Sequence, residues 1–278
     1  MTTRMSVDFV DADTVPASDR GFMYGDGLFE TLRIVGGRVP LWERHCARLR
    51  DGCARLRMPL PDLPAMREEV VRLVAGLPDA VARVTVTRGT GERGYAPPSS
   101  PAPRVVVSVA PLALDAGPYA EGIAVRLCET RLADQPLLAG MKHLNRLEQV
   151  MARAEWSDPA IGEGLVADMA GNVICATAAN VFAVFGDTLV TPAVDRCGVA
   201  GVARAEIAAL RPVSLSPMNP ERLAGADEVF LTSAVRGILP VRAFAARTWR
   251  PGPVTRALQA HWREIGLPLP SDPKDSDR

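Results

Sequence analysis

Lysine is nearly absent from this sequence. Of 32 lysines and arginines, only Lys142 and Lys274 are lysines. Lys274 lies in the polar stretch 269–278, whose composition predicts a disordered tail. Lys142 is then the only lysine expected in the folded part of the chain. It is either a functional residue or a lysine that is present there by chance. Arginine stays protonated, so Lys142 alone can present a neutral amine that attacks a carbonyl carbon.

Cysteine and histidine are too few and too scattered for a disulfide framework or a zinc site. The five cysteines are an odd number without a C-x-x-C pair, and the three histidines add no metal-ligand spacing. The pattern favours reduced thiols in a cytosol, gives little support to a redox-sensing thiol protein, and leads us to expect no metal. The residues are Cys46, Cys53, Cys128, Cys175, Cys197, His45, His143 and His261.

The chain has no excess of charge and no long apolar run. Its formal net charge is +0, so no charge steers it toward nucleic acid or an anionic membrane. Its apolar stretches have the length of strands, and no basic segment followed by an apolar run begins the sequence. We therefore expect a cytoplasmic protein without a signal peptide, bound to neither nucleic acid nor membrane.

The order of predicted elements indicates an α/β (α+β) protein with two domains. We place a smaller N-terminal domain at 1–112, a linker rich in proline and small residues at 113–120, and a larger domain at 121–268. Strands are predicted at 28–35, 81–87, 105–110, 123–128, 164–168, 180–185, 188–191 and 228–232. Helices are predicted at 42–56, from Asp62 to 77, and at 145–156, 202–210 and 254–265.

Lys142 stands before one of these helices. Asn145 and Glu148 have the spacing of a capping box, and Leu147, Val150 and Met151 follow as an apolar stripe. These residues predict that packing holds the segment and that the helix dipole favours a neutral Lys142 amine. Taken alone, these residues favour a surface lysine in a loop.

The segment 138–150, LAGMKHLNRLEQV, resembles the active-site segment of the class IV aminotransferase-type enzymes of fold type IV, which use pyridoxal 5′-phosphate (PLP). Within them it is most similar to the 4-amino-4-deoxychorismate lyases. Further stretches agree in order and spacing, at 18–21, 24–31, 45–49, 88–95 and 178–182. The resemblance implies a fold like that of D-amino acid aminotransferase, PLP as cofactor, a small-molecule substrate and a homodimer.

The resemblance also implies roles for individual residues. Lys142 would be the catalytic residue, forming a Schiff base with PLP and moving protons. Arg48 would bind the cofactor phosphate through its guanidinium fork, and the helix start at Val202 and Ala203 through backbone N–H groups. Thr232 and Ser233 resemble a second phosphate loop. The remaining cofactor candidates are Cys175 and Asn180, and the substrate candidates are Thr31, Arg93, Tyr95 and Arg146; Arg93 would also fit an ordinary surface loop.

Cys175 departs from the family pattern, which has a glutamate there, paired with the pyridine nitrogen. A carboxylate keeps that nitrogen protonated and makes PLP a strong electron sink, whereas a thiol is a weak partner. Either Cys175 tunes the enzyme toward elimination, or the chain has lost ordinary PLP chemistry. We hypothesise the former, because a neutral ring favours prompt expulsion of a leaving group over transamination.

The resemblance therefore implies a lyase that converts 4-amino-4-deoxychorismate to 4-aminobenzoate and pyruvate in folate synthesis. One alternative is an aminotransferase for D- or branched-chain amino acids, against which the absent glutamate and the LAGMKHLNRLEQV run both count. Another is a PLP-binding protein without catalytic activity.

Overall fold

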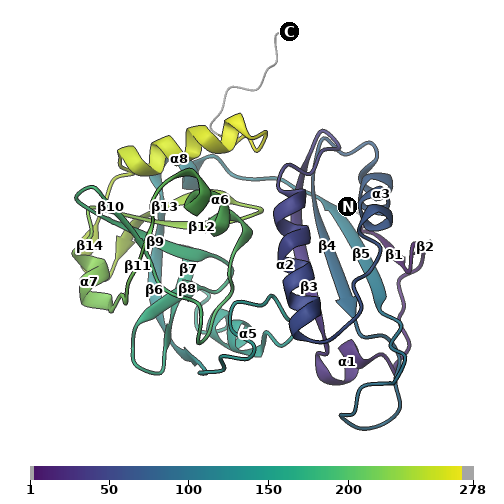
Figure 1. Cartoon of the computed structure of the whole chain (residues 1–278). Helices are drawn as coiled ribbons and strands as arrows, with labels where there is room; N and C mark the ends of the chain where they lie inside the picture. The colour runs from purple at the N-terminus through teal and green to yellow at the C-terminus, as the bar shows by residue number, and fades with distance from the viewer. Residues whose placement is uncertain (1–2, 271–278) are drawn as a thin grey trace. The chain divides into compact units, whose positions relative to one another are not determined.

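The computed structural model describes residues 3–270, which divide into two compact units (Figure 1). The first unit runs to Ala113 and also contains Met141–Asn145, while the second contains Leu114–Gly140 and continues from Arg146. The sequence had placed Lys142 in the C-terminal domain, but its contacts group it with the N-terminal unit. The predicted linker contains a short helix, α4 (Gly117–Glu121), with a buried Tyr119.

The first unit is an antiparallel sheet with helices. Its strand order is β2-β1-β5-β4-β3, which makes β3 an edge strand. The strands are β1 (Arg4–Val7), β2 (Val10–Asp11), β3 (Gly27–Val35), β4 (Asp79–Thr87) and β5 (Arg104–Pro111). The helices are α1 (Arg20–Tyr24), α2 (Trp42–Arg55) and α3 (Leu63–Val74).

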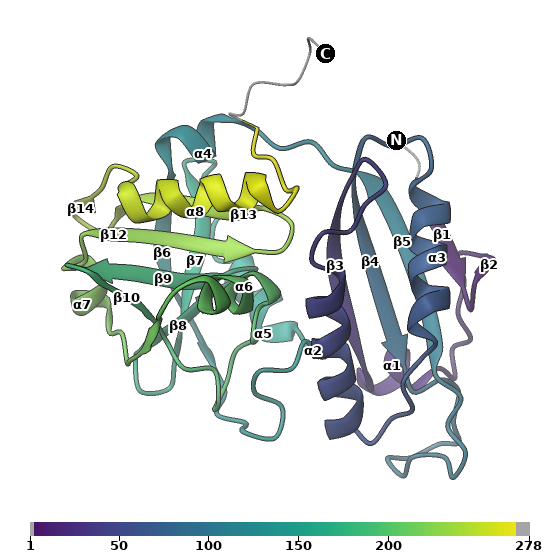
Figure 2. The ribbon, with the colours of Figure 1, turned by 45° about the horizontal axis from the view of Figure 1, so that its top comes forward.

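The two faces of this sheet differ because side chains alternate along each strand. On β3, Leu28, Leu32 and Ile34 share one buried face with Glu30. Helices α2 and α3 cover that face (Figures 1 and 2). The predicted helical spacing of α2 is confirmed, and so is the cap of α3, where the Asp62 carboxylate accepts from the Ala65 N–H at 3.0 Å.

The opposite face carries the other set of β3 side chains. It presents Phe29, Thr31 and Arg33, and the register places Thr31 directly opposite Arg83 of β4. Arg83 in turn lies opposite Ser108 of β5. Residues directly opposite in an antiparallel pair share a face, so Thr31, Arg83 and Ser108 form a polar row across three strands.

The second unit is built on a nine-stranded mixed sheet, with order β11-β10-β9-β12-β13-β6-β7-β8 and β14 beside β13. Its strands are β6 (Ile123–Leu132), β7 (Ile161–Asp168), β8 (Val173–Ala176), β9 (Asn180–Phe185), β10 (Thr188–Thr191), β11 (Ser214–Leu215), β12 (Glu228–Ser233), β13 (Gly237–Phe244) and β14 (Arg247–Thr248). Its helices, besides α4, are α5 (Leu147–Arg153), α6 (Val202–Leu210), α7 (Pro220–Ala224) and α8 (Pro253–Glu264).

The register of this sheet brings three predicted cofactor residues side by side. Asn180 of β9 pairs with Cys175 of β8 on one side and with Thr232 of β12 on the other. Neither β8 nor β13 was predicted. β8 has only four residues, and Pro240 in β13 interrupts the pattern of a central strand.

The predictions around α5 are partly wrong. The helix covers Leu147–Arg153 rather than 145–156, and the supposed packing stripe is exposed, with Leu147 at 70%, Val150 at 61% and Met151 at 58%. No side chain caps α5, and the Glu148 carboxylate instead accepts from the Ala133 N–H at 2.8 Å. A short periodic pattern of apolar residues predicts a helix, but it does not predict which part of a protein packs against the apolar side of that helix.

The C-terminal end of the described chain differs from the prediction. The predicted tail begins too early, because Leu269 is buried; residues 271–278 lie outside the described part.

Within residues 3–270, no helix combines the length and the apolar character needed to cross a membrane.

Candidate active site

The backbone around Lys142 is held by the edge of β3. The Phe29 N–H donates to the Lys142 carbonyl at 2.9 Å, and the Leu144 N–H donates to the Gly27 carbonyl at 3.0 Å. Leu28 and His143 form the bridge between these bonds. The segment thus adds a short length of strand to the sheet. The predicted dipole effect is wrong, because Lys142 pairs with a strand and lies five residues before α5.

The Lys142 amine lies over an aromatic ring of the same strand. Its Nζ is 4.3 Å from the centroid of the Phe29 ring, within the range of a cation–π contact. Phe29 is buried, so the ring is a fixed surface beside the amine. Thr31, a predicted substrate residue, follows two positions later on the same face of β3.

On the other face of β3, a buried glutamate gathers two side chains of α2. The Glu30 Oε1 accepts from Arg48 Nε at 2.8 Å, and its Oε2 lies 2.6 Å from His45 Nδ1 and also accepts from Arg48 Nη2. His45 and Arg48 are three residues apart, which puts them on one side of the helix. Arg48, the predicted phosphate residue, is therefore held in a fixed orientation by a bidentate carboxylate.

The charges of this trio follow from their contacts. Burial by itself raises the pKa of Glu30, but Arg48 and His45 together lower it to about 2. Burial lowers the pKa of His45, and Arg48 and Lys142 lower it further, against the opposing effect of Glu30. At neutral pH the trio is an ionised carboxylate, a guanidinium and a neutral imidazole.

Sequence reasoning overlooked Glu30 and gave His45 no role. A signal was present, because Glu30 occupies an inward position of an otherwise apolar strand: Leu28, Leu32 and Ile34 are the other inward residues. A buried carboxylate needs a cationic partner, and the nearby helix supplies one. Among the described residues, no group of three or more His, Cys, Asp and Glu side chains could hold a metal ion.

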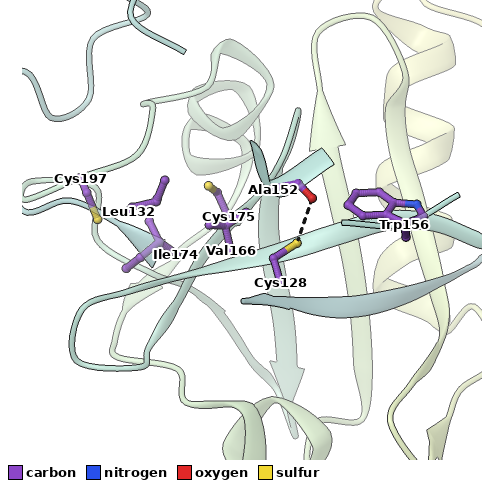
Figure 3. Close-up of a cluster of buried hydrophobic side chains, with 8 residues drawn as sticks. All are labelled: Cys128, Leu132, Ala152, Trp156, Val166, Ile174, Cys175 and Cys197. Atoms are coloured by element: carbon purple, nitrogen blue, oxygen red, sulfur yellow. Dashed lines mark hydrogen bonds between the residues drawn. The ribbon is translucent and has the colours of Figure 1, made fainter. Parts of the chain in front are cut away.

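In the second unit, Cys175 lies in an apolar cluster with Val166, Ile174 and Cys197 (Figure 3). Burial raises the pKa of its thiol to about 12; the neighbouring Cys197 adds to the rise, and the Arg146 guanidinium opposes it. The thiol is therefore neutral at physiological pH. Arg146, a predicted substrate residue, is close enough to act on Cys175 through its charge.

The neighbours of Cys175 across the sheet form a site suited to an anion. Asn180 Nδ2 donates to the Val199 carbonyl at 2.9 Å, in the loop that leads to α6. No side chain caps α6 at Gly201, and a Cβ at Gly201 would lie 2.0 Å from the Asn180 Oδ1. The start of the helix, at Val202 and Ala203, thus keeps N–H groups without a side-chain cap.

Thr232 adds an unsatisfied hydroxyl to this site. It is 1% exposed, and its Oγ1 has no hydrogen-bond partner within residues 3–270. A buried hydroxyl without a partner costs free energy, and this one is available to a ligand that accepts or donates a hydrogen bond. The adjacent Ser233 Oγ accepts from the Arg236 N–H at 3.1 Å, which shapes the turn after β12.

Two other predicted substrate residues lie on a loop of the first unit. Arg93 is exposed, and Tyr95 is 86% exposed. Arg20 holds the loop by donating to the Gly94 carbonyl at 3.0 Å and to the Tyr95 carbonyl at 3.1 Å. The role of Arg93 and Tyr95 in binding a substrate stays a prediction.

Known proteins share both the sequence and the fold. The sequence pattern of the amino-transferase class IV family matches residues 27–244. The chain is 32% identical to an aminodeoxychorismate lyase of Vibrio harveyi over 89% of this chain and 95% of that one. It is 30% identical to a putative branched-chain-amino-acid aminotransferase of Methanocaldococcus jannaschii, over 92% and 93%.

A solved structure agrees with these relatives. The crystal structure of a 4-amino-4-deoxychorismate lyase from Pseudomonas aeruginosa superimposes with a TM-score of 0.90 and 46% identity, over 95% of this chain and 99% of that one. The similarity therefore extends over both units, well beyond the lysine segment.

Glu30→Gln tests the buried trio. The lowered pKa of Glu30 means that its ionised form stabilises the fold above its ordinary pKa of 4.5, and that this stability disappears as the pH falls toward 2. We expect the variant to lose roughly 3 kcal/mol of unfolding free energy at pH 7. The difference from the wild type should shrink between pH 4.5 and pH 2, measured by urea unfolding.

Asp51→Asn is the matched control. Asp51 also pairs with an arginine of α2, at 3.6 Å from Arg55, but its side chain is 64% exposed. Such a surface pair contributes less than about 1 kcal/mol. A Glu30→Gln difference that stays constant from pH 7 to pH 2 would show that the carboxylate charge does not stabilise the unit.

Proposed function

This chain belongs to the class IV amino-transferase family, and from that premise we propose that it is an aminodeoxychorismate lyase. It would convert 4-amino-4-deoxychorismate to 4-aminobenzoate and pyruvate, a step of folate biosynthesis. The observation that carries the proposal is the 46% identity with a solved lyase over nearly the whole length of both chains. A lysine over a buried ring, in a chain almost without lysine, agrees with it.

Enzymes of this family depend on PLP, and the residues present here fit that cofactor. The unsatisfied Thr232 hydroxyl and the uncapped start of α6 suit a phosphate, and the missing Cβ of Gly201 leaves room beside Asn180. When bound, PLP supplies an electron sink for the carbon next to the substrate nitrogen. The residues that would hold it are Arg48, Lys142, Cys175, Asn180, Val202, Ala203, Thr232 and Ser233.

Lys142 has two tasks in the proposed reaction. Its amine removes the ring proton beside the substrate nitrogen, as a general base, and then returns a proton as the enolpyruvyl group departs as pyruvate. The aromatic product makes this elimination strongly downhill. The substrate would be bound by Thr31, Arg93, Tyr95 and Arg146.

Cys175 favours elimination over transamination in this proposal. A thiol whose pKa is raised to about 12 carries no charge at neutral pH, so it does not hold a pyridine nitrogen in its protonated form. Less electron density is then stored in the cofactor, and a leaving group is expelled sooner. The family's usual glutamate would act in the opposite direction.

Lys142→Ala should abolish the covalent link to PLP and lower the formation of 4-aminobenzoate by about 10³-fold or more. Borohydride reduction of the wild type, followed by peptide mapping, should place the cofactor label on Lys142. Lys274→Ala is the control, because it removes the only other lysine and should change neither result. A label on another residue, or active Lys142→Ala enzyme, would contradict the proposal.

Cys175→Glu should shift the balance between the two activities. We expect the ratio of lyase to transaminase turnover to fall by about tenfold or more, because a carboxylate stabilises a protonated ring nitrogen. Turnover is followed as 4-aminobenzoate formed and as exchange of D-alanine or leucine with a keto acid. Cys175→Ser keeps a neutral side chain and should leave the ratio near that of the wild type. An unchanged ratio in Cys175→Glu would refute the role of the thiol.

We further propose that the protein is a homodimer. The exposed apolar side chains of α5, Leu147, Val150 and Met151, make a patch of the kind that is covered in an assembly, and a symmetric pair would cover both copies. Val150→Asp should convert dimer to monomer in sedimentation. Leu215→Asp, at an isolated exposed leucine, should not. A monomeric wild type would contradict the proposal.

A cytoplasmic location is also proposed. All five cysteines are unpaired and buried, as expected for a protein of a reducing compartment.

A further inference from the structure

A buried carboxylate of β7 contacts two turns of the second unit. Glu163 is 4% exposed, whereas the other buried residues of β7 are glycine or apolar. A buried carboxylate is costly unless hydrogen-bond donors surround it, and Glu163 has three. Its Oε1 accepts from the Gly164 N–H at 3.1 Å and from the Thr177 hydroxyl. Its Oε2 accepts from the Arg236 Nη2 at 2.6 Å.

Thr177 begins the turn between β8 and β9. Its hydroxyl donates to Glu163, and its N–H donates to the Gly164 carbonyl at 3.0 Å, so two consecutive residues of β7 hold it. The Ala176 N–H donates to the Ala179 carbonyl at 2.8 Å across the same turn. Asn180 follows directly as the first residue of β9. The contacts of Thr177 with β7 therefore help to fix where Asn180 lies.

Arg236 lies in the turn between β12 and β13. Its backbone N–H donates to the Ser233 Oγ at 3.1 Å, while its guanidinium pairs with Glu163. Thr232, whose hydroxyl has no partner in the described chain, stands just before Ser233 and opposite Asn180 in the strand register. Glu163 thus connects the turn that precedes one candidate cofactor residue with the turn that follows another.

The strands around these turns close into a ring. β8 pairs with β7 on one side and with β9 on the other, and the order β9-β12-β13-β6-β7 completes the circle. The closing pair is short, because β8 and β9 share only the register pair Cys175 and Asn180, whereas β12 and β13 share four pairs. A junction with so few ladder bonds is weakly held by its backbone. The Glu163 contacts add restraint at this junction.

We propose that Glu163, acting through Arg236 and Thr177, is a positioning residue for the phosphate group of PLP. It holds the two turns next to Thr232 and Asn180, so that their polar groups keep the arrangement that binds a phosphate. The inference rests on the proposed assignment of these residues to the cofactor. It does not depend on the identity of the substrate.

The test compares PLP with pyridoxal, which has the same ring and aldehyde but no phosphate. Dissociation constants of both are measured by equilibrium dialysis of the full-length protein, after its cofactor has been removed. The ratio of the two affinities reports the contribution of the phosphate. Glu163→Gln and Arg236→Gln should each lower this ratio by about tenfold or more and change the affinity for pyridoxal by less than about twofold.

The two variants also separate positioning from simple charge. Glu163→Gln makes the surroundings more positive and Arg236→Gln makes them less positive, so an effect of charge alone would move the affinity for PLP in opposite directions. Positioning predicts a loss in both. The double variant should bind PLP about as well as either single variant, because the pair acts as one unit.

Two more variants complete the design. Thr177→Val removes one contact of Glu163 without changing any charge, and it should lower the ratio by about threefold or more. It decides the question if Glu163→Gln does not fold. Arg242→Gln removes an exposed arginine of β13 and should leave both affinities unchanged.

The outcomes distinguish this inference from the proposed cofactor site. If the wild type prefers PLP to pyridoxal and either Arg236→Gln or Thr177→Val retains the full preference, the inference is wrong and the site stands. Equal weakening of both ligands, or opposite effects of Glu163→Gln and Arg236→Gln on PLP, would also overturn it. A wild type that binds PLP no better than pyridoxal would contradict the proposed phosphate site itself.

Discussion

The backbone hydrogen bonds between residues 142–144 and the edge of β3 organise the candidate site residues of the first unit. They are strand bonds, made by groups that cannot rotate away, and they fix where the Lys142 side chain begins. The sheet behind them is anchored by an apolar face under α2 and α3. A reactive amine carried on a loose loop would lose much of its effect, because the rate depends on orientation.

Charged side chains lie on both faces of β3, and their partners differ between the two faces. On its inner face, Glu30 balances Arg48 in a nearly water-free setting, where an unpaired charge would be costly. On its outer face, the Lys142 amine and the Arg83 guanidinium both contact the Phe29 ring. The contacts on the inner face hold Arg48 in a fixed orientation.

The second unit contains polar groups that already have a hydrogen-bond partner and one that has none in the described chain. Asn180 occupies the middle of a three-strand row, and its amide is already bonded to Val199. Beside it, the Thr232 hydroxyl has no partner in the described chain, and the Cys175 thiol is kept neutral by burial. A site made of neutral donors next to an uncapped helix start can receive a phosphate and still leave a pyridine nitrogen without a proton.

The sequence by itself determined the class of chemistry. The resemblance of the LAGMKHLNRLEQV run and of the glycine turns was enough to identify the family and its cofactor. Most of the long helices and strands could also be predicted, because they depend on local pattern. It also located Cys175 at an unusual position. It misjudged α5, since periodicity predicts a helix but not what covers its apolar side.

Only the tertiary structure decided which side chains meet. The Glu30 carboxylate contacts His45 and Arg48, which are fifteen or more residues away in the sequence. The Arg83 guanidinium contacts the Phe29 ring because the register of β3 and β4 places both side chains on one face of the sheet. Such contacts depend on the pairing of distant strands and on the face to which each side chain points. A shift of one residue in the pairing of β3 would move Glu30 and Phe29 to the opposite faces of the sheet.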